Sequence, residues 1–190
     1  MTVPGTFDTS ARELIHAGLQ NLDEARSLFR QLAASGFDAA RCGLLLDALQ
    51  HVCDPDVALR NLVDIVNAQV SQGRALDDIM PDDTAFRQLV AVLGVSDAMG
   101  KLMRFRPDLV QAAATDHCNS HLYNHDQRRA HVLESVGADP NDRMSPTATM
   151  DLADAATALR RTYRNQLAAI IAQDTMSDDP IALQPVSYTH

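Results

Sequence analysis

Five side chains that can bind metal ions lie within a short stretch of the second half of the sequence. They are His117, Cys118, His121, His125 and His131. Three of these histidines are four residues apart, so on a helix they would share one face and could hold a metal ion. The stretch is polar, poor in helix-forming residues, and matches no familiar zinc spacing. A solvated loop or helix end is the favoured interpretation, and a small metal-binding sensor that uses residues 117–131 stays an alternative.

Other polar residues resemble catalytic groups but are better explained by helix ends. Ser96 lies between two glycines, yet the segment lacks the G-x-S-x-G spacing of a nucleophile turn, so we expect a helix N-cap. The paired carboxylates Asp77-Asp78, Asp82-Asp83 and Asp178-Asp179 fall at expected helix starts or in loops, where the helix dipole favours them. No glycine pattern matches a phosphate-binding loop or a dinucleotide fingerprint. We therefore assign no catalytic, cofactor-binding or metal-binding residue in this chain.

A basic cluster falls near the end of the sequence, where Arg160, Arg161 and Arg164 flank Tyr163. A solvated helix face is the default interpretation of such a cluster. A docking surface for an acidic neighbour is the alternative.

Helix signals recur along the whole chain, and convincing strand signals do not. Ser10 and Glu13 have the spacing of a capping box, and Asp54-Pro55 places an N-cap before a proline at the first helical position. These signals predict an all-α domain of about seven to nine helices. The last and longest helix is expected over about Thr149 to Met176, with its arginines on other faces than its apolar residues. The side expected to be buried comprises Leu152, Ala155, Ala156, Leu159, Tyr163, Leu167, Ile170 and Ile171.

Composition limits the classes of function. The net charge is −9 and the sequence pI is about 5.0, a surface that repels nucleic-acid backbones. The sequence shows neither a signal peptide nor an apolar run that could span a membrane, so we expect a cytoplasmic protein without nucleic-acid or membrane partners. The three cysteines do not form a disulfide framework, and Cys42 and Cys53 are expected to be buried thiols.

Four ordered stretches resemble one protein family. They are Asp54–Leu62 (DPDVALRNL), Phe86–Leu109 (which begins FRQLVAVLGVSDAMGKL), Leu133–Pro140 (LESVGADP) and Leu159–Leu167 (LRRTYRNQL). Their order and separation resemble the N-terminal helical region of the bifunctional glutamine synthetase adenylyltransferase/deadenylyltransferases (glutamate–ammonia ligase adenylyltransferases), in the version of high-GC Gram-positive (actinobacterial) organisms. The resemblance covers residues from about 40 to 183.

The resemblance implies a fragment of a large multifunctional enzyme. Members of the family use ATP and Mg²⁺ to attach AMP to a tyrosine of glutamine synthetase, and they remove it by phosphorolysis in nitrogen regulation. A PII-type signalling protein regulates many of them. Their chemistry rests on a Gly-Ser pair and an Asp-x-Asp strand, and this sequence contains no such set. The resemblance therefore implies a structural or docking fragment, inactive alone; a free-standing helical interaction module remains an alternative.

The resemblance also implies a division of the chain. Residues 1–36 would form N-terminal helices, and residues 37–185 would form the helical region before the first nucleotidyltransferase domain, which is absent. The last five residues, 186–190 (VSYTH), resemble the translation of a sequencing-library adapter, and we expect them to be a non-native tail.

Overall fold

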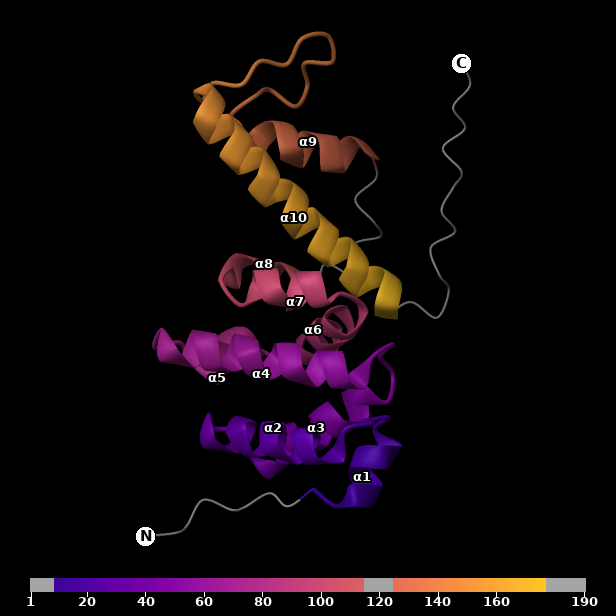
Figure 1. The fold of residues 1–190 in the computed structure, drawn as a ribbon. Helices are drawn as coiled ribbons and strands as arrows, with labels where there is room; N and C mark the ends of the chain where they lie inside the picture. Colours follow the sequence, from indigo (N-terminus) through magenta and orange to yellow (C-terminus); the bar gives the residue numbers. More distant parts are fainter. Residues whose placement is uncertain (1–8, 115–124, 177–190) are drawn as a thin grey trace.

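A computed structural model describes residues 9–114 and 125–176, and this part of the chain forms helices and loops without a strand (Figure 1). The helices are α1 (Ala11–His16), α2 (Leu22–Ala34), α3 (Ala39–Leu49), α4 (Pro55–Ser71), α5 (Leu76–Ile79), α6 (Asp83–Val95), α7 (Asp97–Met103), α8 (Pro107–Ala114), α9 (His125–Ser135) and α10 (Leu152–Met176). The predicted all-α class and the long C-terminal helix are confirmed. No helix in the described ranges combines the length and the apolar character needed to cross a membrane.

The helix starts follow the predicted caps. Ser10 and Glu13 form a complete capping box, in which the Glu13 backbone N–H donates to Ser10 Oγ at 3.3 Å. Asp54 caps α4, and Pro55 occupies the first turn of that helix. Ser96 caps α7 by accepting from the backbone N–H three residues on. The prediction that this serine is an N-cap is therefore confirmed.

One hydrophobic core runs through most of the described chain, from Leu14 to Ala172. Helices α4 and α6 lie at its centre, and α2, α3, α7 and α8 pack around them (Figure 1). Phe29 and Phe86 are its largest fully buried side chains. Residues on both sides of position 36 contribute to this core: Phe29 and Leu32 precede it, and Phe37 follows it and packs against Phe86 with ring centroids 6.3 Å apart.

A second and much smaller cluster lies beside the N-terminal half of α10. It contains Val136, Ala138 and Ala155, with Leu133 and Ala158 packed against it. In Figure 1, α9 and this half of α10 stand above the main body, whereas the other half of α10 lies against it. Helix α10 therefore belongs to both clusters, with small residues at each contact.

Helices α4 and α7 approach closely where a glycine faces an asparagine. A Cβ atom added to Gly100 would lie 2.3 Å from Cγ of Asn61, far inside ordinary contact. Asn61 is buried, and its Nδ2 donates to the carbonyl oxygen of Leu93 at 3.2 Å. This hydrogen bond ties α4 to the end of α6, and only a residue without a side chain fits opposite it.

The prediction for the cysteines is half wrong. Cys42 is fully buried in α3, and burial raises the pKa of its thiol to about 11. Cys53 is exposed, because it lies in the turn between α3 and α4, next to the N-cap Asp54.

The one-turn helix α5 is also missing from the sequence prediction, since four residues are too few to show a helical period.

Candidate functional site

Helix α10 exposes part of the apolar side that the sequence predicts to be buried. Leu152 is 88% exposed, Tyr163 64% and Leu159 40%. With Ala156 they follow one another at intervals of four, three and four residues, so they form a single row along the helix. We call these four residues the apolar stripe. The predicted burial is wrong for Leu152, Leu159 and Tyr163, whereas Ala155 is buried as predicted and Ala156 is half-buried.

The side of α10 that packs inward carries smaller residues. Ala155 faces the small cluster, and Ala168 and Ala172 lie in the main core, where α10 packs against α6 and α8. Leu167 and Ile171 are partly buried against the same core, as predicted for the C-terminal half. Because alanines let helices approach closely, this side of α10 is used for contacts within the chain. The apolar stripe is left facing outward.

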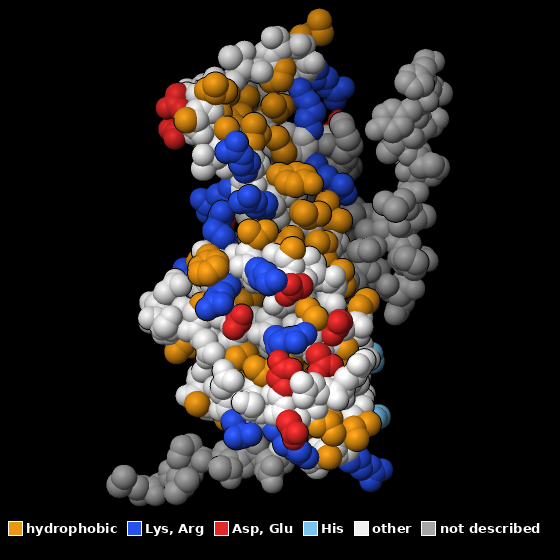
Figure 2. Space-filling model, viewed as in Figure 1, with side chains coloured by type: hydrophobic (Ala, Val, Ile, Leu, Met, Phe, Trp, Pro, Cys, Tyr) orange, Lys and Arg blue, Asp and Glu red, His pale blue; other side chains and the backbone are white. Residues whose placement is uncertain are grey.

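The three predicted arginines have different environments. Arg161 forms an ion pair with Asp108 at the start of α8, in which Nε of Arg161 lies 3.1 Å from Oδ2 of Asp108. Arg160 and Arg164 make no hydrogen bond or ion pair with the described residues. Because they are four residues apart, they form a short basic row beside the apolar stripe. Figure 2 shows Lys and Arg side chains next to hydrophobic ones along this part of the surface.

Asp108 binds two guanidinium groups, and the second of them joins α8 to α10. Arg106 donates to both of its carboxylate oxygens, at 2.9 and 2.7 Å, and Arg161 approaches from α10. The Asp108 side chain is only 20% exposed. Hydrogen bonds from Arg106 are the main cause that lowers the pKa of this carboxyl group, and the charge of Arg161 adds to the effect. Arg161 therefore has a structural role at the helix contact.

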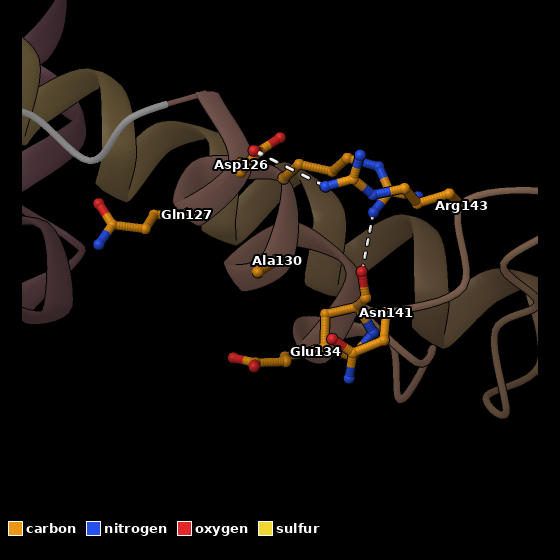
Figure 3. Close-up of a pocket in the computed structure, with 8 residues that line it drawn as sticks. Asp126, Gln127, Ala130, Glu134, Asn141 and Arg143 are labelled. Carbon is orange, nitrogen blue, oxygen red and sulfur yellow. Dashed lines mark hydrogen bonds and ion pairs between the residues drawn. The ribbon is translucent and has the colours of Figure 1, made fainter.

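A polar groove of about 750 Å³ lies between α9 and the loop that follows it. Figure 3 shows Asp126 and Glu134 of α9 on one side and Asn141 and Arg143 of the loop on the other. The guanidinium group of Arg129 donates to the carbonyl oxygens at positions 140 and 142, at 2.9 and 2.7 Å. The Nη2 atom of Arg143 lies 3.9 Å from Asp126 Oδ2. These arginines hold the loop onto α9, and we assign the groove no ligand.

The remaining sequence candidates do not converge in the described residues. His117, Cys118 and His121 lie outside the described residues, and His131 is an exposed residue of α9. Within residues 9–114 and 125–176, no three His, Cys, Asp or Glu side chains come together in a way that could hold a metal ion.

Several carboxylates in the described part of the chain serve helix ends and ion pairs. Asp82 caps α6, and Asp77 pairs with Arg41. Asp54 and Asp56 have Asp-x-Asp spacing but begin a helix. Asp56 accepts the backbone N–H groups at positions 20 and 21, at 3.0 and 3.2 Å.

Comparison with known proteins identifies relatives over nearly the whole chain. The chain is 62% identical over 179 residues to the bifunctional glutamine synthetase adenylyltransferase/adenylyl-removing enzyme of Bifidobacterium longum (strain DJO10A). It is 60% identical over the same length to the enzyme of that name from Bifidobacterium longum subsp. infantis. The enzyme of Leifsonia xyli subsp. xyli is 29% identical over 170 residues. No family model matches the chain, and no solved structure matches it significantly.

The matches cover very different shares of the two sequences. The alignments with the two Bifidobacterium enzymes include 94% of this chain but only 17% of each relative. The chain thus spans about one sixth of the length of these relatives. Over nearly its whole length, the chain is a homologue of one segment of the bifunctional glutamine synthetase adenylyltransferase/adenylyl-removing enzymes.

Proposed function

We propose that this chain serves as a helical segment of an enzyme that adenylylates and deadenylylates glutamine synthetase. The observation that supports this proposal is the 60–62% identity to the Bifidobacterium enzymes over 94% of the chain. In the proposed parent enzyme, AMP from ATP is attached to a tyrosine of glutamine synthetase and later removed by phosphorolysis. Glutamine synthetase is then the protein substrate, a PII-type protein is the regulator, and the parent works in the cytoplasm.

Within that enzyme, the proposed role of the segment is structural support or docking. The sequence contains no Gly-Ser pair, which the family resemblance requires for holding the nucleotide. Its Asp-x-Asp spacing begins α4, where both carboxylates already accept backbone hydrogen bonds. ATP and Mg²⁺ would therefore be held by other parts of the parent, which supply the reaction chemistry.

A segment exchange tests this proposal. The homologous segment of the Bifidobacterium longum enzyme is replaced by this chain, and AMP incorporation into glutamine synthetase is measured with radiolabelled ATP. We expect the chimera to retain AMP transfer and the isolated 190-residue chain to have none. Transfer by the isolated chain, or a folded but inactive chimera, would contradict the proposal. Deletion of the segment from the same enzyme is the matched control.

A further inference from the structure

We propose that the apolar stripe of α10 is a docking surface for an apolar segment with an acidic edge, contributed by the rest of the parent enzyme. This inference rests on the proposed function. It assigns a specific surface and a specific chemistry to the contact between this segment and the remaining part of the polypeptide.

The first argument is the exposure of the stripe. Leu152, Leu159 and Tyr163 present large apolar side chains on one face, and the small, half-buried Ala156 lies between them. Met150, which precedes α10, is also 43% exposed. A contiguous row of this kind, in contrast to scattered apolar residues, is typical of an interface. Tyrosine suits an interface because it buries a large ring and keeps a hydroxyl group for hydrogen bonding.

The second argument is the charge beside the stripe. Arg160 and Arg164 lie on one edge of it and pair with none of the described residues, although the chain as a whole carries a net charge of −9. Arg161, the third member of the cluster, is already paired with Asp108. An edge of two available guanidinium groups fits carboxylates on the partner, and such complementarity selects the partner and its register.

The third argument concerns which partner is available. In the Bifidobacterium relatives, the homologous segment is joined to a remaining polypeptide about five times its own length, since the segment represents 17% of the total length. A tethered partner binds at a high effective concentration, on the order of millimolar for short linkers. A second copy of this chain fits less well. In an antiparallel two-fold pair the same edges face each other, so the arginine rows would meet and repel.

Oxidative footprinting tests the inference. Hydroxyl radicals label exposed side chains, and mass spectrometry measures labelling of Tyr163 in the isolated chain and in the chimera described above. We expect labelling of Tyr163 to fall severalfold in the chimera. Phe105 is the control, because it is 72% exposed and lies between α7 and α8, outside helix α10. Phe86, which is 2% exposed, must stay unlabelled in both proteins and so reports that the segment is folded.

Charge reversal provides the second arm. In the chimera, Arg160→Glu combined with Arg164→Glu should restore labelling of Tyr163 toward the level of the isolated chain. Arg12→Glu on the exposed side of α1 should leave it unchanged.

Three results would overturn the inference. Equal labelling of Tyr163 in the chimera and in the isolated chain means that the rest of the enzyme does not cover the stripe. Protection in the isolated chain that depends on concentration assigns the stripe to a second copy. Protection that requires added glutamine synthetase assigns it to the substrate. An inactive chimera with Tyr163 protected would contradict the proposed function but support this inference.

Discussion

Replacement of Gly100 by alanine should destabilise the protein, although alanine is the better helix former. Gly100 lies inside α7, opposite the buried amide of Asn61. Gly43 provides a matched control, because it also lies inside a helix, α3, but a Cβ atom there meets no atom within 4 Å. The two substitutions are chemically identical, but Gly43 is exposed with open space around it, whereas Gly100 is buried against Asn61.

The structure gives the expected size of the difference. At Gly43, the gain in helix propensity alone should stabilise the protein by about 0.5–1 kcal/mol. At Gly100, the new methyl group would lie 2.3 Å from Asn61 Cγ, so the amide must move by about 1 Å. That movement breaks the buried hydrogen bond to Leu93, at a cost of about 1–3 kcal/mol for the unpaired groups. The net effect of Gly100→Ala is a destabilisation of about 0.5–2 kcal/mol after the propensity gain is subtracted.

Denaturant unfolding followed by circular dichroism measures both changes on the same scale. A double-mutant cycle with Asn61→Ala checks the mechanism, because Gly100→Ala should cost less once the facing side chain is gone. Equal stabilisation by Gly43→Ala and Gly100→Ala would refute the assigned close approach. The absence of coupling between positions 61 and 100 in the double-mutant cycle would also refute the close approach.

Three further predictions concern buried polar groups and thiols. Gln69 is 1% exposed, and neither atom of its side-chain amide has a partner among the described residues. Gln69→Met should therefore stabilise the protein by about 1–3 kcal/mol, measured by denaturant unfolding. A loss of stability of the same size would show that the amide has a role. Asp108→Asn should destabilise the protein at pH 7. Because the folded-state pKa of this carboxyl group is lowered, its contribution is present above the unfolded pKa of about 3.9 and is lost as the pH falls further. The stability difference between the variant and the parent should therefore shrink below about pH 4, and a constant difference would contradict the ion-pair explanation. In a Cys118→Ser variant, the exposed Cys53 should react rapidly with a thiol reagent at pH 8. Cys42 should react only after unfolding, because it is buried and the pKa of its thiol is raised to about 11. Rapid reaction of both thiols in the folded protein would contradict the packing of α3.

Helix starts are predictable from sequence because their signals are local. The side chains of Ser10, Asp54 and Ser96 bond backbone groups only three residues away, so a short window of sequence contains the whole interaction. The C-terminal glycines act in the same way. Gly36, Gly73 and Gly137 follow α2, α4 and α9 with positive φ angles of 102°, 79° and 72°, a conformation that glycine adopts at little cost.

Burial is less predictable, because it depends on partners far along the chain. The spacing of Leu152, Leu159 and Tyr163 correctly indicates an apolar face, but spacing does not tell whether the covering surface belongs to the same chain. Cys53 follows a helix with apolar neighbours, yet the turn directs it to solvent. The contact between Gly100 and Asn61 left no sequence signal, since it joins residues almost forty positions apart.

The continuity of α10 has a mechanical consequence. Its 25 residues contain neither proline nor glycine, so the helix is a rod about 37 Å long without a built-in hinge. Its C-terminal half is fixed by Ala168 and Ala172 in the main core, whereas its N-terminal half packs on the small cluster with α9 and is tied to α8 by the Arg161–Asp108 ion pair. A tilt of about 10° around the fixed half would move the far end by about 4–6 Å, from the length of the rod. A small tilt of α10 about its anchored C-terminal half would therefore displace the apolar stripe together with the N-terminal end of the helix.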